Sequence, residues 1–567
     1  MNNKKGKFLW DHFYKKYKLN NIPNMSLYEY LIKETKYYKE YNAITYFGKK
    51  IDYSTLIENI DRCAKSLKSL GIRENDVVTI CMPNTPEVAY LFLAINKIGA
   101  IANMVHPLSA EEEIKDYLNK TKSVLLIAFS GLYSKIKKII KDTRVYKVVF
   151  ASASESMPII MNSLYNVTRG RKEEKPKNNS FYMFWKEFIN LGNNYNGNIF
   201  VKRDMNDDAV ILHSGGTTGT PKSIVLSNRC FIGMNEQSKV NFHKLVPGDS
   251  VLSILPMFHC FGLIVCLYVP LCLGVTCIMV PEFDKKRFDK VLRKNRPVVL
   301  TGVPTLYEAM LKNEHMDDID FSNVKYVISG GDSVTKEKNK EINDFLKTHH
   351  SPEILQQGYG MTETTGPVCF GSMGSNKLGS VGCPMIGNVV KIVDPETKKE
   401  LKPMEKGEIC VNSVVMMSRY LNDPEATKKT LQLHEDGRYY IHTGDMGYID
   451  KDGIVYFVQR IKRIIVSSGY NIYPEYVENV LRECEYVKDA CLVGVPHPYK
   501  QEIAKVFIIL KDGLEESYTI KRKIMEYAEK NLSHYMLPRE YIYKKEFPRT
   551  KYFKVDYNAL KDELLKK

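Results

Sequence analysis

The chain has 567 residues, more than a single hydrophobic core usually supports, so two or more domains are expected. A hydrophobic content of 44% and a charged content of 26% are ordinary for a globular protein. The net charge of +16 fits a nucleic-acid binder, a membrane-surface binder or a protein that handles polyanions, but the lysines are scattered and form no extended basic arm.

The N-terminus and the cysteines bear on the cellular compartment. The first residues carry charge but lack the apolar core of a signal peptide. The twelve cysteines form no C-x-x-C pair and no His/Cys spacing that suits zinc, and several lie in apolar sequence. We therefore expect a cytoplasmic protein in a reducing compartment.

The first part of the chain predicts alternating helices and strands. Apolar residues recur at helical spacing over residues 52–71, where Thr55 and Glu58 fit a capping box. Residues 77–81 form a short buried strand, and a second helix ends at Gly99. The alternation continues to about residue 350, which predicts an α/β fold of stacked, mostly parallel sheets with outer helices.

Three stretches depart from this alternation. Residues 152–198 are polar and poor in periodicity, and they predict an insertion or surface excursion. Residues 252–280 are strongly apolar, but prolines and glycines break them into pieces of strand and short-helix length, so a membrane span is not expected. From about Gly453 short strands and helices predict a separate small α+β domain of roughly one hundred residues.

Residues 214–222 read SGGTTGTPK and follow an apolar run. Such a loop can wrap backbone N–H groups and one ammonium around the phosphates of a nucleotide. The Walker A motif requires glycine directly before the lysine, whereas Pro221 precedes Lys222 here, so that template fails. Taken alone, the stretch could equally be a surface loop. A second glycine turn follows the strand expected at 324–329 and leads into a helix from about Thr335, a typical place for anions and nucleotides to bind.

Eight blocks of the sequence carry a pattern together: HSGGTTGTPK at 213–222, LPMFHCFG at 255–262, SGGD at 329–332, QGYGMTET at 357–364, GSVGCPMIG at 379–387, HTGDMGYID at 442–450, QRIKRIIVSSGYNIYPEYVE at 459–478 and FPRTKYFK at 547–554. In order and kind they resemble the adenylate-forming superfamily of acyl-CoA synthetases, acyl-adenylating domains and luciferases. The resemblance covers nearly the whole chain. It implies a large AMP-binding domain at 1–461 and a small, mobile C-terminal domain at 462–567.

The resemblance also implies the reaction and its site. A carboxylate and ATP would give an acyl-adenylate and pyrophosphate, and a thiol would then displace AMP. ATP, Mg²⁺ and the co-substrate coenzyme A are the small molecules this requires. The residues implied at the nucleotide and the thiol are Ser214, Gly215, Gly216, Thr217, Thr218, Gly219 and Lys222 around the phosphates, Gly331, Asp332, Tyr359 and Gly360 at adenine, Thr362 beside the metal contact, Asp445 at the ribose, Arg460 at the ribose or a phosphate, and Ser468 and Gly469 facing the thiol.

Further roles come from the same resemblance. Lys554 is expected to be the catalytic cation that bridges the carboxylate and the α-phosphate. Thr218 and Glu363 are expected to contact Mg²⁺, which prefers hard oxygen ligands. His259 matches an aromatic position that gates acyl access, and Lys462 matches the hinge about which the small domain rotates between half-reactions.

Outside these blocks the same residues have ordinary interpretations. Alone, Glu363 would be a solvated turn carboxylate, Asp445 a turn residue, Tyr359 a core aromatic, His259 a buried core histidine and Lys554 a solvated charge.

Five positions depart from the superfamily's usual pattern. Ser223 and Arg419 stand where glycine is usual, and Arg463 and Val466 stand where an acidic residue and a lysine are common. Phe553 replaces the glycine before the catalytic lysine and predicts a stiffer loop.

We expect a fatty-acid–CoA ligase for long- or medium-chain acids. Phe258 and His259 stand where an amino-acid-activating enzyme would hold an aspartate, and no carrier segment that would accept the acyl group is appended. The alternatives are an enzyme that loads a separate carrier protein, a catalytically silent adenylate-binding protein and, less favoured, a nucleic-acid binder. A peripheral membrane contact is compatible with the sequence, and the oligomeric state is open.

Overall fold

The computed structural model describes residues 14, 17, 19, 21–168, 170, 180–214, 222–371, 374–467, 470–472, 474–497, 501–532, 536–550 and 554–566. The chain divides into two compact units, and these are called the first and second unit below. The first unit comprises residues 1–214, 222–389 and 412–441, and the second comprises 215–221, 390–411 and 442–567.

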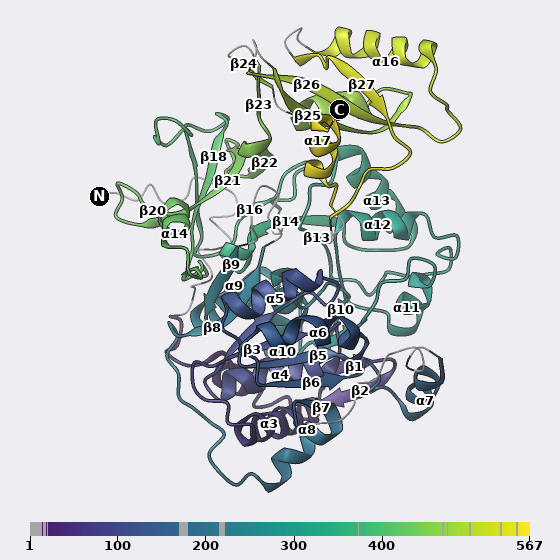
Figure 1. Cartoon of the computed structure of the whole chain (residues 1–567). Coiled ribbons are helices and arrows are strands. Elements are labelled where there is room, and N and C mark those ends of the chain that lie inside the picture. Colours follow the sequence, from purple (N-terminus) through teal and green to yellow (C-terminus); the bar gives the residue numbers. More distant parts are fainter. Residues whose placement is uncertain are drawn as a thin grey trace. The chain divides into compact units, whose positions relative to one another are not determined.

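An eight-stranded sheet in the first unit contains the two strands that flank the glycine-rich loop in the sequence, β8 and β9 (Figure 1). Its pairings are parallel except between β19, β9 and β8, which are antiparallel. Its strands in spatial order are β19 (Arg419–Tyr420), β9 (Ser223–Ser227), β8 (Asp208–His213), β4 (Ile101–Met104), β3 (Val77–Cys81), β5 (Leu125–Phe129), β6 (Lys147–Ala151) and β7 (Tyr182–Phe184).

A nine-stranded sheet in the same unit carries the blocks at 329–332 and 357–364, which are expected to bind the nucleotide. It is parallel from β1 through β14 and antiparallel at its two ends. Its strands in spatial order are β16 (Cys383–Pro384), β15 (Gly366–Phe370), β14 (Leu355–Met361), β13 (Tyr326–Ser329), β12 (Val299–Gly302), β10 (Ser250–Ser253), β11 (Thr276–Met279), β1 (Asn42–Tyr46) and β2 (Lys49–Asp52).

Helices alternate with these strands along the chain, as βαβ connections require. The α-helices among the described residues of this unit are α2 (Leu27–Glu34), α3 (Tyr53–Ser69), α4 (Pro86–Lys97), α5 (Glu111–Lys120), α6 (Tyr133–Ile139), α7 (Ile159–Thr168), α8 (Trp185–Leu191), α9 (Asn228–Asn241), α10 (Val269–Cys272), α11 (Phe288–Asn295), α12 (Pro304–Leu311), α13 (Lys336–Thr348) and α14 (Pro424–Thr430). A π-helical segment η5 (Phe261–Tyr268) precedes α10, and a 3-10 turn η6 (Thr362–Thr364) follows β14.

A third sheet contains β17 (Val389–Val393), β18 (Gly407–Asn412), β21 (Tyr439–Ile449) and β20 (Leu431–Leu433) in that order, with β22 (Val455–Arg460) paired to β21. The remaining sheet belongs to the second unit and contains β24 (Tyr470–Ile472), β23 (Ile465–Ser467), β26 (Gln501–Leu510), β25 (Val487–His497) and β27 (Glu540–Tyr543). Its helices are α15 (Pro474–Arg482), α16 (Tyr518–Asn531) and α17 (Tyr557–Leu565), and a 3-10 turn η7 (Ile461–Arg463) precedes β23.

Helix α4 is buried along its whole length and packs between other buried elements. The ring of Phe92 lies 5.7 Å from that of Phe231 in α9 and 6.5 Å from that of Tyr268 in η5. A helix that is apolar on all sides is stable only inside a core. This cluster of aromatic rings is therefore central to the first unit.

The expected α/β architecture is confirmed, and so are most of the expected elements. Strand β3 spans residues 77–81 as expected, and Gly99, just after α4, has the positive φ of 78° that favours glycine. The cap of α3 differs from the expected Thr55–Glu58 box, because Asp52 caps the helix by accepting a 2.7 Å hydrogen bond from the Thr55 amide.

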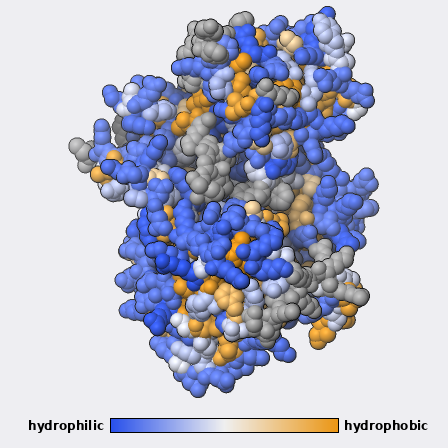
Figure 2. All heavy atoms as spheres, viewed as in Figure 1, coloured by the Kyte–Doolittle hydropathy of each residue, from blue (hydrophilic) through white to orange (hydrophobic). Residues whose placement is uncertain are grey.

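The expectation of a surface excursion at 152–198 is only partly right. Helix α7 carries exposed apolar residues, among them Ile159 and Ile160 at 86% and 83% exposure, and apolar surface appears at its position in Figure 2. Strand β7, by contrast, extends the eight-stranded sheet, and Trp185 and Phe188 of α8 are buried. Helix α8 lies beside α3 (Figure 1). Short, weakly periodic elements were missed because tertiary contacts stabilise them.

The apolar stretch at 252–280 forms β10, η5, α10 and β11, as expected. Gly262 allows η5 to begin close to the preceding turn, because a Cβ there would lie 2.1 Å from the carbonyl oxygen of Pro256. Among the residues that the structure describes, no helix is both long and apolar enough to cross a membrane. All twelve cysteines are buried, and none of them forms a disulfide.

Candidate functional site

The two ends of the glycine-rich loop are held together by hydrogen bonds. The Ser214 amide donates to the Lys222 carbonyl at 2.9 Å, and the Lys222 amide donates to the Ser214 hydroxyl at 3.3 Å. Beneath them, the two ring nitrogens of His213 lie 3.1 Å from the Ser223 hydroxyl and 2.7 Å from the Asn103 side-chain oxygen. Ser223, a departure from the usual glycine, therefore gives the buried histidine a partner. The loop residues Gly215, Gly216, Thr217, Thr218 and Gly219 lie outside the described residues.

Glu363 lies in the turn η6, where β14 ends and β15 begins. Gly360 allows the backbones of β14 and β15 to lie close together here, because a Cβ at this position would lie 1.9 Å from the carbonyl oxygen of Gly366. The Glu363 side chain is 7% exposed, and its backbone carbonyl accepts a 2.7 Å hydrogen bond from the Met417 amide. Next to it, the Thr362 hydroxyl donates to Cys260 Sγ at 3.6 Å. The carboxylate is thus held on a rigid, largely buried turn.

Tyr420 contacts both Lys222 and Glu363. Its hydroxyl donates a 2.7 Å hydrogen bond to Glu363 Oε1, and the Lys222 ammonium lies 4.1 Å from the centre of its ring. The two charged residues come from different sheets of the first unit and are brought together by this one side chain. Tyr420 lies outside the eight sequence blocks. Its neighbour Arg419, which replaces the usual glycine, is the one unusual residue beside it.

The residues expected at adenine lie where β13 and β14 end. These neighbouring strands are parallel, with Ser329 opposite Gln357. Gly331 has a φ of 84° and is exposed, and Asp332 is exposed as well. Tyr359 in β14 is 9% exposed, so its ring is largely packed. The carboxyl edge of parallel strands is a common place for ligands to bind in α/β sheets.

His259 lies two residues before η5 and is half-buried. Its Nδ1 accepts a 3.3 Å hydrogen bond from the Phe261 amide, and its carbonyl accepts one of 2.9 Å from the Leu263 amide. The preceding Phe258 stacks on His106, with ring centroids 4.0 Å apart. His106 did not stand out in the sequence, and only the fold shows that it lies against this segment.

In the second unit, Asp445 and Arg460 face each other across β21 and β22. They are register partners, and Arg460 Nε lies 3.4 Å from Asp445 Oδ1. The Asp445 side chain is 5% exposed and that of Arg460 is 47% exposed. In this pair the carboxylate is buried, and the guanidinium beside it is partly exposed to solvent.

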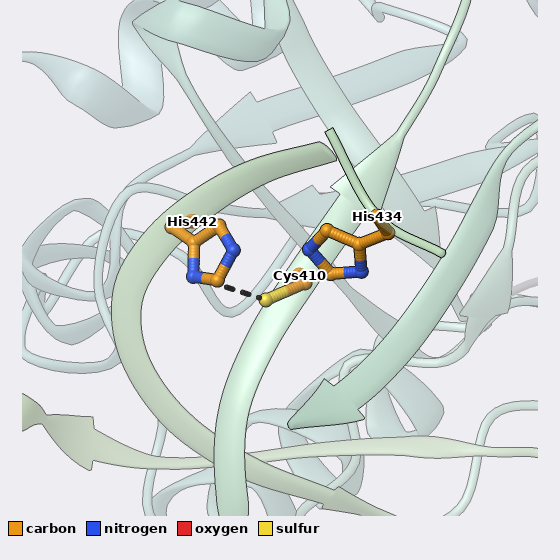
Figure 3. A group of neighbouring side chains, drawn as sticks. All are labelled: Cys410, His434 and His442. Atoms are coloured by element: carbon orange, nitrogen blue, oxygen red, sulfur yellow. Dashed lines mark hydrogen bonds between the residues drawn. The ribbon is translucent and has the colours of Figure 1, made fainter. Parts of the chain in front are cut away.

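The turn that carries Asp445 is braced by strand β18. The imidazole of His442 lies 2.8 Å from Glu408 Oε2, and the amide of Gly444 donates to Glu408 Oε1 at 3.0 Å. Burial raises the pKa of Glu408, but the hydrogen bond and charge of His442 outweigh it and hold that pKa below its usual value. Figure 3 shows the hydrogen bond between Cys410 and His442, whose Sγ and Nδ1 are 3.5 Å apart.

The segment before Lys554 forms a small turn in the second unit. The Thr550 amide donates to the Lys554 carbonyl at 2.7 Å, and Arg549 and Val555 form an antiparallel bridge. Lys554 is half-buried. The structure does not describe Phe553, Ser468 and Gly469, and it describes only the backbone of Lys462 and Val466.

Arg463, which stands where an acidic residue is common in the superfamily, is a structural residue of the second unit. Its guanidinium lies 2.5 Å from Glu478 Oε1 and 4.8 Å from the centre of the Tyr557 ring, and it donates to the Leu492 carbonyl at 3.4 Å. Burial lowers the pKa of Arg463, but the Glu478 carboxylate outweighs this and raises it, so the guanidinium stays charged. The residue thus links η7 to α15, β25 and α17.

Compact packing places residues 442–461 in the second unit, ahead of the domain boundary expected at 461/462. The expected boundary marks the hinge about which the small domain would rotate. Grouping residues by their packing does not test the place of a hinge, so this boundary stays a prediction.

Comparison with known proteins agrees with this arrangement. The sequence profile of AMP-binding enzymes matches residues 33–421, and that of the AMP-binding enzyme C-terminal domain matches residues 476–554. A long-chain-fatty-acid–CoA ligase of Bacillus subtilis is 30% identical over 96% of this chain and 95% of its own length. A 4-coumarate–CoA ligase of Arabidopsis thaliana is 28% identical over 91% of this chain and 87% of its own.

Solved structures show the same fold. The ATP-bound crystal structure of MatB from Rhodopseudomonas palustris has a TM-score of 0.81 at 22% identity, over 95% of this chain and 98% of that one. An anthranilate–CoA ligase in complex with anthranoyl-AMP also has a TM-score of 0.81, at 20% identity, over 96% and 98% of the two chains. With both sequence profiles matched in the order of the two domains, the chain belongs to the family of AMP-binding enzymes and carries that family's C-terminal domain.

Proposed function

We propose that this AMP-forming acid–CoA ligase acts on a fatty acid. It would join the acid to ATP, giving an acyl-adenylate and pyrophosphate, and then transfer the acyl group to coenzyme A with release of AMP. The observation that carries the proposal is that Tyr420 contacts both Lys222, the last residue of the motif expected to bind phosphate, and the buried carboxylate of Glu363.

Charge repulsion is the main obstacle to this chemistry. A carboxylate is a weak nucleophile and must approach an anionic α-phosphate, so catalysis depends on positioning and on neutralising charge. Lys222 would bind the pyrophosphate part of ATP. Lys554 would bridge the carboxylate and the α-phosphate in the adenylation step.

The residues at Glu363 fit a magnesium ion. Mg²⁺ prefers one or two carboxylates together with water and phosphate oxygens, and Glu363 offers a hard carboxylate on a rigid turn. Thr218 is the second ligand that we propose. When bound, Mg²⁺ would neutralise part of the charge of the triphosphate.

Other residues would hold the nucleoside. The buried Asp445 carboxylate would accept hydrogen bonds from both ribose hydroxyls, and the more exposed Arg460 would bind the ribose or a phosphate. Tyr359, Gly331 and Asp332 would contact adenine from the ends of β13 and β14.

The preference for a fatty acid rests on apolar residues and on similarity. The acyl-facing stretches that we propose, 259–263, 301–305 and 330–331, contain small and apolar residues and no carboxylate that could hold an amino group. The relative from Bacillus subtilis, at 30% identity, is named for long-chain fatty acids. We also propose coenzyme A as the acceptor and the cytoplasm as the location.

Pyrophosphate release with a panel of acids tests the proposal directly. We expect release with medium- or long-chain fatty acids, and a CoA thioester when coenzyme A is present. Release without a thioester would favour loading of a carrier protein. No release with any acid would favour a silent adenylate-binding protein.

A further inference from the structure

We propose that Tyr420 is a positioning residue that sets Lys222 and Glu363 relative to each other, its ring holding the ammonium and its hydroxyl holding the carboxylate. The inference rests on the proposed function, in which these two groups serve pyrophosphate and Mg²⁺. It adds a residue that acts through both of them and need not touch the substrate itself.

The side-chain geometry suits this role. Tyr420 is 4% exposed, and its hydroxyl lies 2.7 Å from Glu363 Oε1 while the Lys222 ammonium lies 4.1 Å from its ring centre. The hydroxyl therefore donates to the carboxylate from a buried position, while the face of the same ring holds the ammonium.

The backbone around Tyr420 ties the same two regions together. Tyr420 pairs with Ile224 in β9, and the Leu421 amide donates to the Ser223 carbonyl at 2.8 Å, one residue beyond Lys222. On the other side, the Met417 amide donates to the Glu363 carbonyl at 2.7 Å. Residues 417–421 are therefore hydrogen-bonded both to Ser223, just after the glycine-rich loop, and to the turn that contains Glu363.

Arg419 fastens this segment to the eight-stranded sheet. Its guanidinium donates two hydrogen bonds to Asp208 in β8, of 3.0 and 2.5 Å. Such a two-pronged pair fixes direction as well as distance. The departure from the usual glycine at position 419 thus makes β19 a firm base for Tyr420.

A tyrosine can do here what a charged residue could not. An aromatic ring attracts an ammonium without neutralising it, so Lys222 keeps its full charge for a phosphate. A carboxylate in the same place would pair with Lys222 and compete with the phosphate. The hydroxyl donates to one oxygen of Glu363, which would leave the other oxygen to hold a metal ion.

Two variants separate the two contacts. Tyr420→Phe keeps the ring but removes the hydroxyl, so we expect the Mg²⁺ concentration for half-maximal pyrophosphate release to rise about tenfold, while the KM for ATP at saturating Mg²⁺ changes less than twofold. Tyr420→Leu removes both contacts, and we expect the KM for ATP to rise about tenfold as well. Tyr53→Phe is the matched control, because Tyr53 is fully buried and its hydroxyl donates to the Leu271 carbonyl.

Binding measurements keep this test apart from that of the proposed function. Calorimetric titration of each variant with ATP, at low and at saturating Mg²⁺, should show the same pattern as the kinetics. If the wild-type chain binds MgATP but releases no pyrophosphate with any acid, the proposed function fails while the pattern of binding still decides the role of Tyr420. The inference is overturned if Tyr420→Phe leaves the Mg²⁺ dependence unchanged, if its effects equal those of Tyr53→Phe, or if the wild-type chain does not bind MgATP.

Discussion

At the scale of single residues, the two lysines that we propose for the reaction have different surroundings. Lys222 lies over an aromatic ring in the first unit, and Lys554 lies half-buried in a turn of the second unit. In the proposed reaction, Lys222 serves pyrophosphate and Lys554 serves only the adenylation step. The two half-reactions should therefore respond differently to the loss of Lys554.

Lys554→Ala should lower acyl-adenylate formation by two to three orders of magnitude, because a charge that stabilises the transition state in a water-poor site contributes about 3–4 kcal/mol. Thioester formation from supplied acyl-adenylate should remain close to the wild-type rate. Stopped assays of each half-reaction measure the two rates. An equal loss in both would show that Lys554 has another role.

Glu87, in the first turn of α4, should make stability depend on pH. Its carboxyl is 1% exposed, and burial raises its pKa from 4.5 to about 7 even though Ser156 donates a hydrogen bond to it. The folded chain therefore holds this proton more tightly than the unfolded chain. The contribution of Glu87 to stability should therefore be most favourable below about pH 4.5, fall as the pH rises through the window from 4.5 to 7, and reach a constant penalty of about 3 kcal/mol above it.

The variant Glu87→Gln removes this titration. We expect its melting temperature to exceed that of the wild-type chain at pH 8 and to match it near pH 4, as measured by thermal unfolding at both values. A constant difference at the two pH values would mean that the carboxyl does not titrate in this window.

At the scale of elements, contacts between distant segments decide what local sequence leaves open. The expected capping box at Thr55 has the right spacing, but Asp52 is available three residues earlier and caps α3 instead. Strand β7 is only three residues long and shows no alternation, so its place in a sheet comes from pairing with β6. Sequence patterns identified the long elements well and the short ones poorly.

Arg463 lies next to the expected hinge, but we expect it to contribute strongly to the free energy of unfolding of the second unit. Arg463→Ala leaves Glu478, which is 3% exposed, without its closest cation, and we expect a loss of about 3 kcal/mol in the second unit. Hydrogen exchange of the amides of α15 and β25 in the full chain measures this loss. Arg522→Ala is the control, because its ion pair with Glu526 is exposed on both sides and should contribute less than 0.5 kcal/mol. Equal effects of the two variants would contradict the structural role of Arg463.

At the scale of the whole molecule, the net charge of +16 still calls for an explanation. A chain whose function depends on that charge would bind nucleic acid tightly. We expect only weak binding to duplex DNA that falls steeply between 50 and 200 mM salt, as non-specific phosphate contacts do. Fluorescence anisotropy across this range of salt measures it, and tight binding at 200 mM would support a nucleic-acid function.

The residues that the blocks imply at the nucleotide stay a prediction, whereas the alternation of helices and strands predicted the α/β fold and the eight blocks predicted the family, and both of these are confirmed. This succeeds because glycine turns, buried strands and helix ends depend on residues that are neighbours in sequence. Tyr420, Arg463, His106 and β7 could not be predicted in this way. Each owes its role to partners far away in the chain: Tyr420 meets Lys222 and Glu363 only because β19 pairs with β9 and lies beside the η6 turn. The sequence by itself thus determined which chemical groups are present, and the tertiary structure decided which of them meet, because packing between strands and turns has no counterpart in local spacing.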